Sequence, residues 1–118
     1  MESLQNQRAF FFAICNGPKE QHLRRQLLKP MSREQVHAFC ELALNILYGA
    51  VPLSHEKRKL LRPLKPFLRS LSQLDNGPIV RKKIILSHIP ETFFIIQTVF
   101  KAIDKLVWIR DGAKRGVK

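Results

Sequence analysis

Apolar side chains recur at intervals of three and four residues along most of the chain, which is the spacing of one face of an α-helix. The clearest such stretch follows Ser32, an N-cap residue with Gln35 three positions later, and the two complete a capping box. We expect this helix to run to Tyr48 and to end at Gly49, with Phe39 in the core. Its apolar face is predicted to consist of Val36, Phe39, Cys40, Ala43, Ile46 and Leu47.

Two shorter amphipathic segments precede this helix, separated by Gly17 and Pro18. The first is expected to be one helix from Leu4 to Cys15. The second is expected to start at Pro18, because proline suits the first turn of a helix, and to stop before Pro30. Arg24 is predicted to lie on its exposed polar face. Its apolar stripe is predicted to be Leu23, Leu27 and Leu28.

Pro63 and Pro66 interrupt the segment after the connector at residues 51–53. Each proline removes a backbone donor and disfavours helical geometry in the residue before it, so both cannot lie within one straight helix. We therefore predict a short helix from His55 to Leu61, capped by Ser54. A kink follows, and then a second helix from residue 64 or 65 to residue 73.

Two more helices are predicted after a turn at Asp75–Pro78. The first covers Ile79–Leu86, where β-branched residues leave a strand as the alternative. The second opens at Pro90 and reaches about Trp108. Its buried face is predicted to contain Phe93, Ile96, Val99 or Phe100, Ile103, and Leu106 or Val107.

The pattern as a whole predicts an all-α fold, a compact bundle of about five to six short helices with a Pro-kinked basic segment. With 118 residues, 45% of them apolar, the chain can bury one modest core without disulfides or metals. We expect a single helical domain over residues 1–110 and a flexible basic tail over residues 111–118.

Positive charge is the unusual feature of the composition. The net charge is +12, of which residues 1–50 carry +2 and residues 51–118 carry +10. Basic residues crowd the segment Leu53–Lys83, threaded with leucines, so a folded surface and not a bare tail is expected to present them. The class of partner that best suits such a surface is a polyanion, most often nucleic acid. The predicted binding residues are Lys57, Arg58, Lys59, Arg62, Lys65, Arg69, Arg81, Lys82 and Lys83.

Catalytic, metal and cofactor chemistry finds no support in the sequence. No serine or cysteine has a credible base, and neither a carboxylate pair nor a phosphate-binding loop is visible, so we expect no enzyme and no small-molecule substrate. His37 and Cys40 are spaced as a metal pair could be, but no four-ligand pattern accompanies them. We expect Cys15 and Cys40 to be reduced, buried thiols with raised pKa values. No metal or cofactor is therefore predicted.

Membrane insertion and secretion are not predicted. The apolar run at residues 84–100 is interrupted by polar residues, and the one at residues 9–15 is too short for a signal peptide. The expected location is intracellular. Tyr48 and Trp108 are the plausible groups for stacking on bases, but both are expected at the edge of the core.

Residues 27–72 contain several short sequence motifs in a fixed order, and the basic triplet Arg81-Lys82-Lys83 follows them. The motifs are Asn45–Gly49, Pro52-Leu53-Ser54, Lys57–Leu60 and Phe67–Leu71. In these motifs the chain resembles small basic proteins of Maverick/Polinton transposons and of adinto- and adomavirus-type DNA viruses. The resemblance implies a virion core or capsid-associated protein that contacts packaged DNA in the nucleus or the virion. The chain lacks the Gly-rich apolar tail of that group and has an amphipathic segment at residues 93–108 instead.

Two hypotheses for function follow from the sequence. The first is non-catalytic, largely sequence-independent binding of nucleic acid, with DNA favoured over RNA, as in a virion core or packaging protein. The second is a helical interaction module, such as a minor capsid or adaptor protein. Its basic face would dock on an acidic protein or on an anionic membrane surface.

Overall fold

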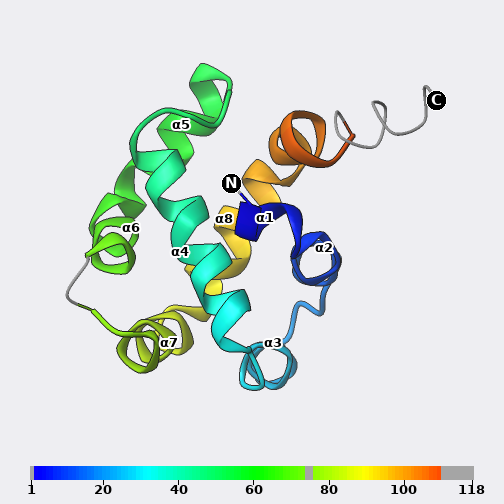
Figure 1. Cartoon of the computed structure of the whole chain (residues 1–118), viewed down its shortest axis with the longest axis vertical. Helices are drawn as coiled ribbons and strands as arrows, with labels where there is room; N and C mark the ends of the chain where they lie inside the picture. Colours follow the sequence, from blue (N-terminus) through cyan, green and yellow to red (C-terminus); the bar gives the residue numbers. More distant parts are fainter. Residues whose placement is uncertain (1, 74–75, 110–118) are drawn as a thin grey trace.

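Two helices of fifteen residues, α4 (Arg33–Leu47) and α8 (Ile89–Ile103), carry most of the core (Figure 1). They belong to a computed structural model that describes residues 2–73 and 76–109. These residues include no strand, so the all-α prediction is confirmed, and residues 79–86 are helical. The shorter elements are α1 (Glu2–Gln5), α2 (Arg8–Cys15), α3 (Gln21–Leu28), α5 (His55–Leu61), the 3-10 turn η1 (Arg62–Leu64), α6 (Lys65–Ser72), α7 (Pro78–Leu86) and the π-helical segment η2 (Asp104–Ile109).

Helix α4 has the ends that its sequence predicts and most of the predicted buried face, although Ile46 and Leu47 are only half-buried and Ala38 and Leu42 are buried in addition. The backbone N–H of Gln35 donates to Ser32 Oγ at 3.1 Å, and the backbone N–H of Ser32 donates to Gln35 Oε1 at 2.9 Å. The helix ends before Gly49, whose φ of 70° is the left-handed conformation that glycine adopts without strain. Phe39 is buried, and its ring centroid lies 6.4 Å from that of Phe67 in α6.

Helix α8 is buried on more than one face. The predicted core residues Phe93, Ile96, Val99 and Ile103 are all buried, and so are Ile89, Thr92 and Ile95. The additional burial arises because α2, α3, α5 and α7 all pack against this helix. It therefore forms the part of the core that most other elements share.

The first predicted helix is in fact broken into α1 and α2 by a turn at Asn6 and Gln7. Leu4 is buried where α1 packs against α4 and η2, whereas Phe11 and Ile14 are buried where α2 packs against α8. One straight helix would not point these residues at two different partners. Tertiary packing thus overrides the local preference for a continuous helix.

The second predicted helix starts later than expected, at Gln21. The predicted burial of Leu23 and the predicted exposure of Arg24 are both wrong. Leu23 is 40% exposed, although Leu28 is buried as predicted. Arg24 is half-buried: its Nε donates to the carbonyl of Pro18 at 2.6 Å, and its guanidinium lies 4.4 Å from the centre of the Phe93 ring. Arg24 therefore links α3 to α8 through its contact with Phe93.

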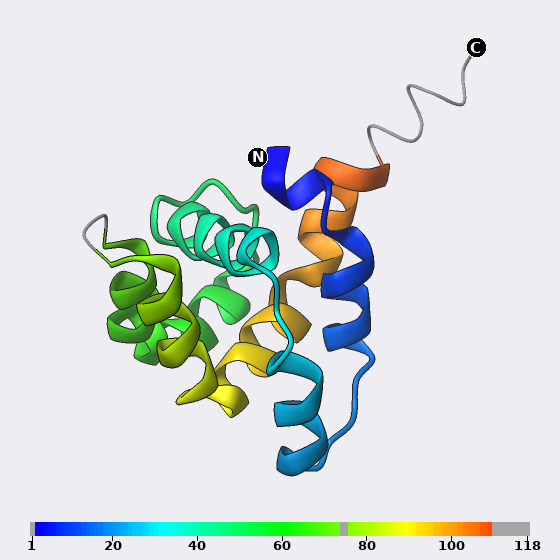
Figure 2. The same ribbon diagram turned by 60° about the horizontal axis from the view of Figure 1, so that its bottom comes forward.

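The Pro-kinked basic segment is confirmed: α6 lies beside α4 together with α7, whereas α5 lies near the C-terminal end of α4 (Figures 1 and 2). Helix α5 ends at Leu61, the prolines fall in and just after the tighter turn η1, and α6 continues to Ser72. Both α6 and α7 pack against α4, while α1 and α2 lie on its other side. The expected tail at residues 111–118, Asp75 of the expected turn and the side chain of Trp108 fall outside the described residues.

Candidate functional site

The nine predicted binding residues lie on four consecutive elements of the kinked segment. They are Lys57, Arg58 and Lys59 on α5, Arg62 in η1, Lys65 and Arg69 on α6, and Arg81, Lys82 and Lys83 on α7. Within the described residues none of the nine forms an ion pair. No carboxylate of the described residues therefore neutralises their charge at close range.

Four of these cations share one line along the segment. Arg58, Arg62, Lys65 and Arg69 belong to three successive elements, and the grooves that they line, which share Lys65, place them in a row. Arg58, Arg62 and Lys65 line a groove of about 360 Å³ between this path and the end of α4. Lys65 and Arg69 line a second groove of about 360 Å³ beside it.

Arg81 and Lys82 also hold the fold together. Arg81 donates from Nη2 to the carbonyl of Gln73 at 2.8 Å, and Lys82 donates from Nζ to the carbonyl of Met31 at 2.8 Å. Both side chains are half-buried, whereas Lys83 beside them is exposed. These bonds join α7 to the end of α6 and to the start of α4. Arg81 and Lys82 therefore serve the scaffold as well as any partner.

Lys57 lies apart from Arg58 and Arg62. It lines a separate cleft of about 650 Å³ together with Lys101 of α8 and Lys105 of η2, two elements that lie far from α5 in the sequence. Asp104 in the same cleft is paired with Arg8 at 3.0 Å. The two lysines were missed in the sequence because only the folding of α8 against α5 brings them close to Lys57.

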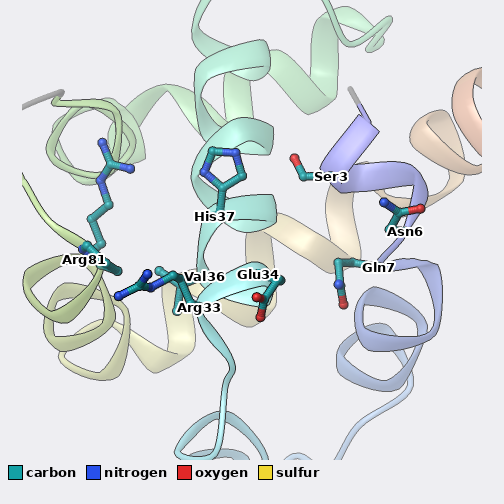
Figure 3. A pocket seen from close by; sticks show the side chains of 9 residues that line it. Ser3, Asn6, Gln7, Arg33, Glu34, Val36, His37 and Arg81 are labelled. Atoms are coloured by element: carbon teal, nitrogen blue, oxygen red, sulfur yellow. The ribbon is translucent and has the colours of Figure 1, made fainter.

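A pocket of about 400 Å³ lies across the exposed side of α4, between α1 and α7 (Figure 3). In this view His37 stands in the middle. Arg33 and Arg81 lie on its α7 side, and Glu34 and Ser3 lie on the other. The cationic half of the pocket thus continues the basic surface, and Arg33, like Lys101 and Lys105, is a contributor that could not be recognised from the sequence. The opposite half is polar and carries an acidic group.

The prediction of two buried thiols is confirmed for Cys40 but is wrong for Cys15, which is only half-buried. Cys40 is buried, and burial raises its pKa to about 11, although the nearby Arg81 charge acts in the opposite direction. Burial also raises the pKa of the half-buried Cys15. His37 is exposed while Cys40 is buried, so the two do not converge. No group of three metal-ligating side chains occurs among the residues whose positions are described.

Tyr48 does not lie at the edge of the core as expected. It caps the end of α4 and is 80% exposed. Leu60, Ile79 and Val80 on α5 and α7 are exposed too, at 55%, 74% and 46%. The basic side of the molecule therefore carries apolar groups as well as charge.

No protein-family model, curated protein sequence or solved structure gave a match to this chain. In the part of the chain that the structure describes, no helix is both long and apolar enough to cross a membrane. The function therefore has to be inferred from the surface of this chain itself.

Proposed function

We propose that this chain is a non-catalytic nucleic-acid-binding protein that contacts phosphates through its basic helices, largely without regard to sequence. The supporting observation is the row of Arg58, Arg62, Lys65 and Arg69 along one side of the molecule, with no carboxylate paired to it in the described residues. Arginine grips a phosphate with two parallel hydrogen bonds, and lysine adds a mobile point charge. A row of such cations suits a partner with repeated negative charges, such as a nucleic-acid backbone.

Duplex DNA is the proposed main partner, because the resemblance of residues 27–72 is to proteins that contact packaged DNA. A role in a virion core or in genome packaging is consistent with this binding mode, since condensing a genome requires many contacts of low sequence preference. The charge of +12 has the same implication, because a polyanion would relieve the self-repulsion of the free protein.

The test compares two variants that lose equal charge. Arg58→Gln with Arg62→Gln should weaken binding to unrelated duplexes alike and lower the slope of log affinity against log salt by about 2, or roughly 0.9 per phosphate contact. Lys19→Gln with Lys29→Gln, at the two ends of α3, removes the same charge from exposed positions outside the row. This control should leave binding nearly unchanged. Equal effects of both pairs would show that net charge, and not this surface, determines binding.

A helical interaction module is the second candidate, and the exposed apolar residues Leu60, Ile79 and Val80 favour it. Apolar side chains among cations suit an acidic protein surface or an anionic membrane surface. Salt distinguishes this candidate, because a specific protein interface with an apolar centre keeps its affinity at salt concentrations that release a phosphate-bound protein.

A further inference from the structure

The exposed ring of Tyr48 stands at a rigid point of the backbone. The N–H of Gly49 donates to the carbonyl of Ile46 at 3.1 Å, and the N–H of Ala50 donates to the carbonyl of Asn45 at 2.9 Å. These two bonds form a Schellman motif, which closes the last turn of α4 and fixes the direction in which the chain leaves it. Tyr48 is therefore presented to solvent by an ordered helix end and not by a loose loop.

Tyr48 also forms one wall of the second groove described above, here called the Tyr48 groove. Apolar Leu44 and Leu47 lie on the same helix, and the facing wall comes from α6 and the residue after it. The full lining is Leu44, Leu47, Tyr48, Lys65, Arg69, Ser72 and Gln73. The groove thus places one exposed aromatic ring beside two cations.

The Tyr48 groove continues into the groove that Arg58 and Arg62 line, because Leu47 and Lys65 belong to both. A single strand of nucleic acid bound at Tyr48 would therefore extend along the row of cations from Arg69 toward Arg58. Lys65 lines both grooves, so the four cations border one path along which adjacent phosphates can be contacted.

We propose that the Tyr48 groove binds single-stranded nucleic acid, with an unpaired base stacked on the Tyr48 ring and the adjacent phosphates contacted by Lys65 and Arg69. Aromatic rings stack on any base, so this mode needs no sequence readout and agrees with the proposed function, on which it rests. A base within a duplex has both faces covered by its neighbours and cannot stack in this way. Tyr48 should therefore add affinity for single strands alone.

The test measures binding of oligo-dT and of a duplex of the same length to the full chain, at one salt concentration. Tyr48→Ala should weaken oligo-dT binding about 5- to 100-fold, the usual range for loss of one stacking partner, and leave duplex binding little changed. Tyr48→Phe, which keeps the aromatic face, should retain oligo-dT binding. Leu60→Ala is the control, since it removes an exposed apolar side chain of α5 that does not line the Tyr48 groove and leaves the aromatic ring in place.

Cross-linking supplies a second measurement. Irradiation of the wild-type complex with an oligonucleotide containing 5-iodouracil should attach the base to Tyr48, which mass spectrometry can locate. Cross-links that map elsewhere would overturn the proposal, as would equal loss of single-strand and duplex binding in Tyr48→Ala. Tighter binding of poly-glutamate than of oligo-dT, lost on Tyr48→Ala, would assign the groove to an acidic protein instead.

These outcomes separate the two proposals. If Tyr48→Ala has no effect on oligo-dT while the Arg58 and Arg62 variant loses duplex binding, the single-strand site is wrong and the proposed function stands. If the wild-type chain binds neither nucleic acid, the proposed function itself fails.

Discussion

Arg24 illustrates how much the environment of one residue can depend on contacts that are distant in sequence. Its hydrogen bond to Pro18 lies within the same segment, but its ring partner, Phe93, is on α8. A charged donor bonded to a backbone carbonyl and stacked on an aromatic ring contributes more than an exposed arginine does. The spacing of apolar residues in α3 does not indicate the contact between Arg24 and Phe93.

Arg24→Ala should therefore lower the free energy of unfolding by about 1–3 kcal/mol, from loss of the charge-assisted hydrogen bond and the cation–π contact. Gln26→Ala, at an exposed position of the same helix, should change it by less than about 0.5 kcal/mol. Urea denaturation of both variants checks the difference. Equal, small effects would mean that Arg24 is solvated.

Cys40 gives a second prediction at this scale. Because burial raises its pKa to about 11 from 9.0, its thiolate fraction at pH 8 is about one hundredth of that of an unperturbed thiol. Labelling of Cys40 by a thiol reagent should therefore be slow in the native state, slower than labelling of Cys15, and fast in denaturant.

The same shift has a defined pH dependence. The unfolded thiol ionises first as pH rises, so the contribution of Cys40 to stability is complete below pH 9 and is lost between about pH 9 and pH 11. Cys40→Ala should reduce this alkaline loss. Rapid native labelling of Cys40, or stoichiometric zinc in protein purified without added metal, would contradict a structural role for this thiol.

At the scale of elements, the sequence predicted most of what local chemistry determines. The capping box at Ser32, the boundaries of α5 and the kink at Pro63 follow from groups that lie close together in the chain. The break between α1 and α2 could not be predicted, because it depends on which helices Leu4 and Phe11 contact. The caps and the prolines could be recognised from neighbouring residues, whereas the turn at Asn6 and Gln7 depends on tertiary contacts.

Helix α4 allows the packing of elements to be tested. Phe39→Ala should lower the free energy of unfolding by about 3–5 kcal/mol, because it opens a cavity where α4 meets α6 through Phe67. His37→Ala on the exposed side of the same helix should cost less than about 0.5 kcal/mol. Thermal melts would distinguish the two, and similar melting temperatures would contradict the helix register.

The sequence names candidate cations but does not show how they are arranged or which further residues lie beside them. The nine cations could be named from the sequence, whereas the fold shows that Arg81 and Lys82 are tied to backbone carbonyls and that Lys57 shares a cleft with Lys101 and Lys105. The exposure of Tyr48 was also missed, because an aromatic residue at a helix end suits a core edge equally well. Only the tertiary fold shows which residues that are far apart in the sequence lie close together in space.

On the scale of the whole molecule, the basic residues are unevenly placed. Nine of the fifteen basic residues in the half with a net charge of +10 belong to the kinked segment and α7, whereas Lys101 and Lys105 of the same half lie on α8 and η2. The first half, at +2, supplies α1 to α4 and much of the core. The kinked segment and α7 are therefore the favoured place for a polyanion to bind.

Affinity for two unrelated DNA duplexes, measured across a series of salt concentrations, is the decisive measurement for the proposed binding mode. If Arg58, Arg62, Lys65 and Arg69 each neutralise one phosphate, log affinity should fall linearly with log salt with a slope of about −3 to −4, or steeper where further cations contribute. The two duplexes should give the same line. A slope shallower than about −1, or affinities that differ strongly between the two sequences, would contradict phosphate-directed binding by the basic helices.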